Sequence, residues 1–177
     1  DCEASEKLKE MLIEINIDTS YLITQKNRFT SKKTRVIASQ QQVVRFDQET
    51  TQEISTRSQD AIIKLFEKIV SGYDIILFSD YGKGLFTLNL TQSLIKITKK
   101  YNLKILVDPK GLDYKKYNGA YLLTPNKKEA SEATNIPIID NSSLVKALQK
   151  LKDLCNLNIS LITLSEQGVA IFDDDLR

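Results

Sequence analysis

The 177-residue sequence contains no histidine and no tryptophan, and it has only two cysteines, Cys2 and Cys155. The lack of histidine excludes histidine-based acid–base catalysis. Without histidine or a Cys-x-x-Cys motif, the chain also has no zinc-type metal site. Two cysteines do not make a disulfide framework, so we expect free thiols in a reducing, cytoplasmic compartment.

Long apolar runs and an excess of one charge are also missing. No apolar run approaches the roughly 18–20 residues of a membrane-spanning helix, and no signal-type segment is present. We therefore expect a soluble protein without a membrane partner. Lys and Arg number 25 against 23 Asp and Glu, a net charge of +2, which gives no support to a nucleic-acid partner. Apolar residues make up 41% of the chain, enough for the core of a domain.

The two ends of the sequence have the character of cut ends. The chain begins at Asp1 without a methionine and enters a helical pattern at once, and it stops at Arg177 just after a strand pattern. We expect residues 1–177 to be the central fragment of one larger domain.

Hydrophobic periodicity predicts an α/β domain. Short apolar runs typical of buried strands alternate with segments of helical spacing. The expected strands are 74–78, 103–107, 120–123, 159–163 and a return strand at 169–172, and the expected helices are 3–15, 58–70, 88–101, 127–134 and 142–155. This alternation predicts βαβ units in a doubly wound, mostly parallel sheet with helices on both faces.

A different pattern occupies residues 19–48. Segments 34–38 and 43–47 read as strands joined by a short polar stretch, which predicts an antiparallel hairpin. Val44 and Phe46 alternate with Arg45 and Asp47, so one face of the hairpin should be polar. A further short strand is expected at 21–24.

Residues 121–129, Tyr-Leu-Leu-Thr-Pro-Asn-Lys-Lys-Glu, mark a strand that stops and a helix that starts. Pro125 cannot continue a ladder, and Asn126 is a good helix N-cap. A carboxylate and an amide at the carboxyl end of a strand can hold a hydrated Mg²⁺ and a phosphate. Alternatively, Glu129 only completes a capping box.

Four strand ends are polar, and parallel strands place such ends at one edge of the sheet. Lysines beside glycines suit a phosphate, while Asp108 and Glu129 suit sugar hydroxyls or a metal ion. Each segment could instead be an ordinary turn, with Asp80 as an Asx-turn residue and 163–168 as a hairpin loop. The four segments are Ser79-Asp80-Tyr81-Gly82-Lys83-Gly84, Asp108-Pro109-Lys110-Gly111, Thr124-Pro125-Asn126-Lys127-Lys128-Glu129 and Thr163-Leu164-Ser165-Glu166-Gln167-Gly168.

These segments, together with Thr34–Ile37 and Gln41–Asp47, resemble ribokinase-family (PfkB-type) carbohydrate kinases over nearly the whole chain. The Asn-x-x-Glu motif is similar to the superfamily motif that serves Mg²⁺ and the ATP phosphates. The Asp-Tyr-Gly-Lys-Gly and Asp-Pro-Lys-Gly segments resemble those of the kinases that phosphorylate D-glycero-β-D-manno-heptose 7-phosphate at O1. The resemblance thus implies a ribokinase-like fold with a small β-lid at about 19–48, and ATP and Mg²⁺ as cofactors.

The resemblance also implies roles for particular residues. The group near ATP and Mg²⁺ would be Asn126, Lys127, Lys128, Glu129 (to the metal through water), Thr163, Ser165 and Gly168, although Ser165 stands where the family more often has glycine. The group facing the phosphorylated sugar would be Arg35 and Arg45 from the lid, with Lys83, Asp108 and Lys110. For the two arginines, a solvated strand face is the alternative.

Two family motifs are absent from this sequence: an N-terminal Gly-Gly segment and the Gly-Ala-Gly-Asp whose Asp is the catalytic base. No catalytic base is therefore assigned within the chain. The resemblance further implies a homodimer through the lid strands and, in the parent protein, a fused adenylyltransferase for ADP-heptose and lipopolysaccharide core synthesis. A kinase for another sugar and a non-catalytic α/β binding module stay open as alternatives.

Overall fold

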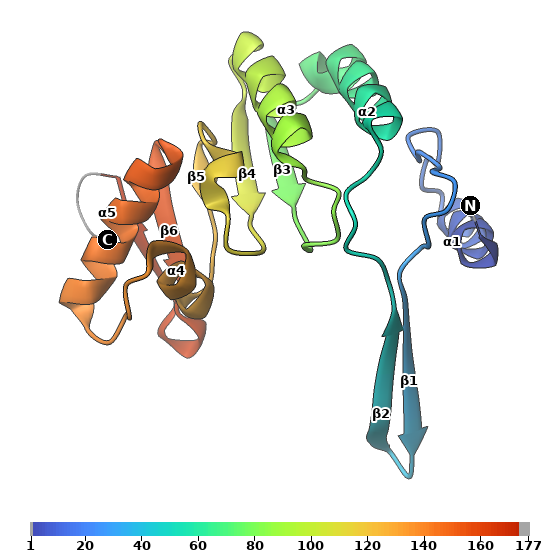
Figure 1. Ribbon diagram of the computed structural model, residues 1–177, viewed down its shortest axis with the longest axis horizontal. Coiled ribbons are helices and arrows are strands. Elements are labelled where there is room, and N and C mark those ends of the chain that lie inside the picture. Colours follow the sequence, from blue (N-terminus) through green and yellow to red (C-terminus); the bar gives the residue numbers. More distant parts are fainter. Residues whose placement is uncertain (1, 174–177) are drawn as a thin grey trace.

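The computed structural model describes residues 2–173 and contains a five-stranded sheet and a separate two-stranded hairpin (Figure 1). The large sheet has the order β3-β4-β5-β6-β7, with β3 to β6 parallel and β7 antiparallel to β6. All five expected strands are present. Their bounds are β3 (Ile75–Ser79), β4 (Lys104–Asp108), β5 (Leu122–Leu123), β6 (Ile159–Thr163) and β7 (Val169–Phe172).

The five expected helices are also present, and polar caps define where several of them begin. Ser55, Thr87 and Asp140 accept hydrogen bonds from backbone N–H groups of the first turn. The helices are α1 (Glu3–Glu14), α2 (Thr56–Ile69), α3 (Leu88–Lys100), α4 (Lys127–Thr134) and α5 (Asn141–Cys155), with short 3₁₀ turns η1 (Val70–Gly72), η2 (Tyr114–Tyr117) and η3 (Ser165–Gln167).

The core lies between one face of the sheet and the helices that connect its strands. Phe78, Val107 and Ile162 from the strands pack with buried residues of the helices such as Leu94 of α3 and Leu148 of α5. Burial of these apolar side chains is the main favourable term that holds the sheet and helices together. The predicted ribokinase-like, mostly parallel α/β architecture is confirmed.

Helix cover is found on one face of β3, whereas the sequence predicted cover on both. Ile76 and Phe78 are buried, but Ile75 and Leu77 on the opposite face are 54% and 67% exposed. The physical reason is the strand order. Consecutive parallel strands added in one direction through right-handed crossovers place all their connecting helices on the same side, and only a reversal of order covers the other side. The described strands show no such reversal.

The hairpin projects away from the large sheet at the end where the parallel strands stop (Figure 1). It consists of β1 (Lys32–Ala38) and β2 (Gln41–Gln48), joined by a two-residue turn at Ser39 and Gln40, both with positive φ. Two consecutive positive-φ residues are typical of the tight turns that join antiparallel strands. The predicted hairpin is confirmed, with a tighter turn than expected.

The strand expected at 21–24 is wrong, because this segment is irregular and lies outside both sheets. Tyr21, Leu22 and Ile23 have strand-forming side chains, but no neighbouring strand pairs with their backbone and they stay between 38% and 48% exposed. Cys2 and Cys155 are free thiols, as predicted. Within residues 2–173, no helix combines the length and the apolar character that crossing a membrane would require.

Candidate active site

The polar segments that follow β3, β4, β5 and β6 meet at one edge of the sheet, the lower edge in Figure 1. Because these four strands are parallel and in register, their carboxyl ends point the same way. The Asp80 N–H donates to the carbonyl of Asp108 at 3.0 Å, which joins the first two segments directly.

The Asn-x-x-Glu segment forms the start of α4. Glu129 N–H donates to Asn126 Oδ1 at 2.9 Å, and Asn126 N–H donates to Glu129 Oε2 at 3.1 Å. This is the capping box that the sequence allowed as an alternative. The other carboxylate oxygen, Oε1, accepts from Lys110 Nζ at 2.6 Å. The glutamate therefore caps the helix and also pairs with a lysine from the neighbouring strand end.

The segment 163–168 lies beside Asn126. Thr163 N–H donates to the Pro125 carbonyl at 2.9 Å, and Asn126 and Thr163 form a parallel bridge. Residues 164–168 make the turn of the β6–β7 hairpin, with Leu164 N–H donating to the Gly168 carbonyl at 2.8 Å. The structure thus places two groups of candidate ATP and Mg²⁺ residues side by side, one at the start of α4 and the other at the end of β6 and in the β6–β7 turn. Lys127 and Lys128 are exposed in the first turn of α4.

Asp108 lies at the end of β4, two residues before Lys110. Partial burial raises the pKa of its carboxyl group, and the neighbouring charges of Glu129 and Asp80 raise it further, while Lys110 acts in the opposite direction. Three carboxylates and a lysine therefore influence one another electrostatically at this edge.

Lys83 is placed at the junction between the sheet edge and the base of the hairpin. Its ammonium group pairs with Glu49, which also lies 3.6 Å from Lys33 of β1. Arg28 donates to the Lys83 carbonyl and, at 2.7 Å, to the Gln52 carbonyl. These contacts fasten the loop that carries Lys83 to the segments before and after the hairpin.

Arg35 and Arg45 lie directly opposite each other on the polar face of the hairpin. The Asp47 carboxylate accepts hydrogen bonds from Arg45 Nε at 2.9 Å and from Arg45 Nη2 at 2.7 Å, which holds the guanidinium group in place. The hairpin extends away from the sheet, so the structure does not bring either arginine up to the edge that carries Lys110 and Glu129 (Figure 1). Their substrate role therefore stays a prediction, and a solvated strand face stays its alternative.

Three residues outside the predicted site form a buried cluster at the same edge. The Asp80 carboxylate accepts from Lys116 Nζ and from the Tyr117 hydroxyl, each at 2.6 Å. Asp80 also accepts from the Gly82 N–H at 2.7 Å, which is the Asx turn that the sequence allowed. Lys116 and Tyr117 lie in η2, a short stretch between strands without a periodic pattern, so no sequence signal marked them.

The donor chemistry of Asn126 and Glu129 fits Mg²⁺, which prefers oxygen ligands and keeps several waters. Both Glu129 oxygens and the Asn126 side-chain oxygen already accept hydrogen bonds. No group of three or more metal-ligating side chains occurs within residues 2–173. The residues therefore fit a hydrated ion held through water rather than a direct cage.

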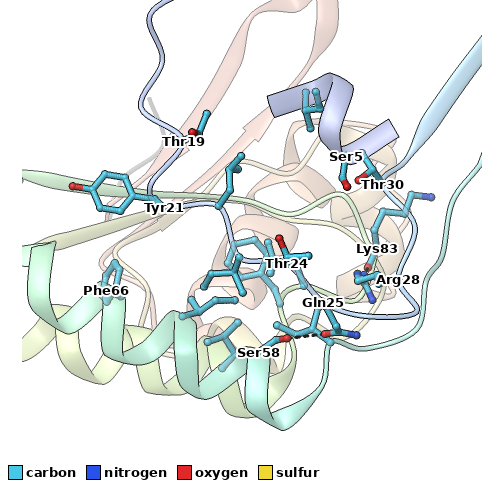
Figure 2. Close-up of a pocket in the computed structure, with 18 of the residues that line it drawn as sticks. Ser5, Thr19, Tyr21, Thr24, Gln25, Arg28, Thr30, Ser58, Phe66 and Lys83 are labelled. Atoms are coloured by element: carbon cyan, nitrogen blue, oxygen red, sulfur yellow. Dashed lines mark hydrogen bonds between the residues drawn. The ribbon is translucent and has the colours of Figure 1, made fainter. Parts of the chain in front are cut away.

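A cavity of about 680 Å³ lies between α1, the segment 19–30, α2 and β3 (Figure 2). Its lining is mostly apolar, including Phe66 and Phe78, with a polar pair where Ser58 Oγ donates to Gln25 Oε1 at 2.9 Å. Lys83 contributes to this lining, whereas Lys110 and Glu129 lie outside it. The cavity thus adjoins the polar edge at Lys83.

Comparison with known proteins assigns the chain to a family. Residues 1–176 match the family described as pfkB family carbohydrate kinase. The chain belongs to the pfkB family of carbohydrate kinases. The family predicted from the sequence is therefore confirmed.

Individual relatives agree with this assignment. The chain is 56% identical over 176 residues to a protein named "Bifunctional protein HldE" from Aliarcobacter butzleri, covering 99% of this chain and 37% of that protein. It is similar in fold to the tetrameric inhibited form of phosphofructokinase-2 from Escherichia coli, with a TM-score of 0.75, 20% identity, and coverage of 99% of this chain and 58% of that one. It also resembles an Arabidopsis thaliana ribokinase complexed with ribose and ATP, with a TM-score of 0.53, 19% identity, and coverage of 71% and 38%. The chain thus spans little more than a third of the length of this bifunctional relative.

Proposed function

We propose that the protein catalyses ATP-dependent phosphorylation of D-glycero-β-D-manno-heptose 7-phosphate at O1, giving the 1,7-bisphosphate for ADP-heptose and lipopolysaccharide core synthesis. The observation that carries the proposal is the meeting of Lys110 with Glu129, from neighbouring strand ends, at 2.6 Å. It puts a cation suited to a substrate phosphate beside a carboxylate suited to hydrated Mg²⁺. Relatives at 41–56% identity share the name HldE.

The nucleotide side of the site would be built by the segments after β5 and β6. Asn126 and Glu129 would hold Mg²⁺ through water, with Lys127 and Lys128 close to the ATP phosphates. Thr163, Ser165 and Gly168 would line the phosphates from the adjacent hairpin turn. Bound Mg²⁺ would offset negative charge on the phosphoryl group in transfer. The residues of this chain would orient the phosphates and neutralise their charge.

The sugar side would be built by the segments after β3 and β4. Lys83 and Lys110 would bind the phosphate that the substrate already carries, and Asp108 would accept hydrogen bonds from sugar hydroxyls. Arg35 and Arg45 would reach in from the hairpin. Lys83 and Lys110 have no evident role with an uncharged sugar, so they favour a phosphorylated sugar as the substrate over an unphosphorylated one.

The proton of the attacking hydroxyl requires a carboxylate base. The Gly-Ala-Gly-Asp motif that supplies this base in the family is not in the 177-residue sequence. We therefore expect the polypeptide of residues 1–177 to show no turnover by itself, and the activity is proposed for the full-length natural protein.

We also propose a cytoplasmic location, a homodimer joined through the hairpin and a fused adenylyltransferase. Val36, Val44 and Phe46 give the hairpin an apolar face and are between 44% and 58% exposed. Exposed apolar surface of this kind is typical of an interface. The name of the HldE relatives describes those proteins as bifunctional.

The test is to supply the full-length protein with ATP, Mg²⁺ and candidate sugars and to identify the product by ³¹P nuclear magnetic resonance. We expect a new anomeric phosphate on heptose 7-phosphate and no comparable reaction with ribose or fructose 6-phosphate. If the protein prefers another sugar, the proposed substrate is wrong but the proposed kinase activity stands. A full-length protein that transfers no phosphate to any sugar would favour a non-catalytic binding module.

A further inference from the structure

The carboxylate of Asp80 is buried at the sheet edge, although the mechanism outlined above gives it no part. Its side chain is 2% exposed. Oδ2 accepts from Lys116 Nζ and from the Tyr117 hydroxyl, each at 2.6 Å. The Lys116 side chain is itself only 16% exposed, and Tyr117 is fully buried. A carboxylate and an ammonium group have thus been taken out of water together.

The second carboxylate oxygen of Asp80 fixes the loop that carries Lys83. Gly82 N–H donates to Oδ1 at 2.7 Å, and Gly82 has a φ of +65°. A Cβ atom at this position would lie 3.2 Å from Cγ of Lys110, so the loop rests against the stem of that lysine. The conformation of the first loop therefore limits where the Lys110 side chain can lie.

Two further contacts tie the second loop to the same cluster. Asp80 N–H donates to the Asp108 carbonyl at 3.0 Å, and Lys110 N–H donates to the Tyr117 hydroxyl at 3.4 Å. Burial, together with the bond to Asp80, holds the pKa of Tyr117 well above its usual range. The phenol therefore stays protonated and keeps donating to the carboxylate.

A buried ion pair is a weak source of stability, since well-packed apolar side chains of similar volume often serve a fold as well. A fully satisfied polar network does something different, because it allows one arrangement of its members and penalises others. We propose that Asp80, Lys116 and Tyr117 are positioning residues that set the spacing between Lys83 and Lys110, and so determine affinity for the phosphorylated sugar. This inference rests on the proposed function.

The decisive comparison is Lys116→Met with Lys115→Met in the full-length protein. Lys115 precedes Lys116 in η2 and is exposed, so its replacement removes the same charge without touching Asp80. For Lys116→Met we expect KM for heptose 7-phosphate to rise about tenfold or more, with kcat and KM for MgATP within about twofold of wild type. For Lys115→Met all three constants should stay within about twofold of wild type.

Tyr117→Phe keeps the buried ring and removes a single oxygen, so it tests the same cluster even if Lys116→Met fails to fold. It should raise KM for the sugar phosphate in the same selective way but by less. Lys116→Arg, which keeps a cation that can reach Asp80, should recover part of the loss. Equal increases in both KM values, or a fall in kcat alone, would show that the cluster only supports the fold and would overturn the proposal.

A second readout separates this proposal from the proposed function. Amide hydrogen exchange at Gly82 and Lys110 can be followed in the same variants without any substrate. We expect faster exchange at both amides in Lys116→Met and wild-type exchange in Lys115→Met. If wild type prefers another phosphorylated sugar, the KM comparison is made with that sugar. Unchanged exchange in Lys116→Met overturns the positioning role even when the kinase activity is established.

Discussion

Lys110 Nζ lies 2.6 Å from Glu129 Oε1, which joins the residue proposed for the substrate phosphate to the residue proposed for Mg²⁺. The Lys110 side chain is 54% exposed, whereas that of Glu129 is 15% exposed. The hydrogen bond and charge of Glu129 raise the pKa of Lys110. Lys110 thus neutralises Glu129, and a bound sugar phosphate would compete with Glu129 for the ammonium group.

The first prediction concerns this competition. Lys110→Met should raise KM for the sugar phosphate more than KM for MgATP, because the phosphate loses its cation. It should also lower the free Mg²⁺ needed for half-maximal rate by about twofold to fivefold, since an exposed pair is weak. Glu129→Gln should have the opposite effect on Mg²⁺. Rates measured across a series of free Mg²⁺ concentrations check both variants.

Lys150→Met is the matched control, because Lys150 is an exposed lysine of α5. It should leave both the KM values and the Mg²⁺ dependence unchanged. If Lys110→Met alters the two KM values equally, Lys110 does not belong to the sugar side of the site. If Glu129→Gln keeps the wild-type Mg²⁺ dependence, the capping box alone explains that glutamate.

The second prediction is a pH dependence that arises from Asp108. Its raised folded-state pKa means that the carboxylate form is lost at a higher pH than the ordinary aspartate value of about 4. In our proposal the carboxylate accepts hydrogen bonds from sugar hydroxyls. As the pH is lowered, KM for the sugar should therefore start to increase while the pH is still above the ordinary aspartate pKa of about 4. In Asp108→Asn this acid limb should disappear.

Acidification weakens sugar binding through Asp108, but it has the opposite effect on the stability of the fold. An acid whose pKa is higher in the folded than in the unfolded state binds its proton more tightly when folded, so acidification stabilises the fold through this group. On acidification we therefore expect KM for the sugar to rise while the contribution of Asp108 to the melting temperature increases. An Asp108→Asn enzyme with the same acid limb as wild type would assign that limb to another group.

Local patterns were enough to predict much of this fold. The bounds of α4 and β6 agree with the sequence at both ends, because a good N-cap at Asn126 and a short apolar run leave little choice. The strand predicted at 21–24 failed because strand formation depends on a partner, which local composition does not supply. The exposure of Ile75 and Leu77, on the face of β3 without helix cover, likewise depends on strand order.

The site was predictable only in part, for the same reason. Parallel strands bring Lys110 and Glu129 to one edge, so their proximity follows from the βαβ pattern. The partners of individual charges do not follow from it. Glu49 pairs with Lys83 across 34 residues, and Lys116 reaches Asp80 across 36, through contacts that no local signal specifies.

The third prediction concerns the hairpin turn at 164–168. Gly168 has φ 87° and ψ −130°, a region that is essentially restricted to glycine, and a Cβ there would meet no atom within 4 Å. Gly168→Ala should therefore destabilise the protein through backbone strain alone, by about 1–3 kcal/mol. If this turn lines the ATP phosphates, KM for MgATP should rise more than KM for the sugar phosphate.

Ser165→Gly is the opposite test in the same turn. Ser165 adopts a φ of 55°, which costs a residue with a Cβ roughly 1 kcal/mol. Glycine should relieve that strain and keep or raise the melting temperature, while Gly168→Ala lowers it. Equal melting temperatures for Gly168→Ala and wild type would mean that the turn relaxes freely, which is incompatible with a rigid phosphate loop.

The fourth prediction tests the apolar face of the hairpin. Val36 and Val44 are cross-strand partners, Phe46 lies on the same face, and Phe46 is 58% exposed. A second copy of this face would bury these side chains, which explains an apolar surface on an element that contacts little else in the described chain. Phe46→Glu should convert the full-length protein from dimer to monomer, as measured by light scattering after size-exclusion chromatography.

Ile139→Glu supplies the matched control, because Ile139 is 82% exposed and lies between α4 and α5, away from the hairpin. It places the same charge on apolar surface elsewhere and should leave the mass unchanged. Because the turn at Ser39 and Gln40 and the Arg45–Asp47 pair are retained in Phe46→Glu, the hairpin itself should persist. A dimer that survives Phe46→Glu would exclude this face as the essential contact between subunits. Arg35 and Arg45 could then reach the proposed sugar site only if the hairpin moves toward it without a partner subunit.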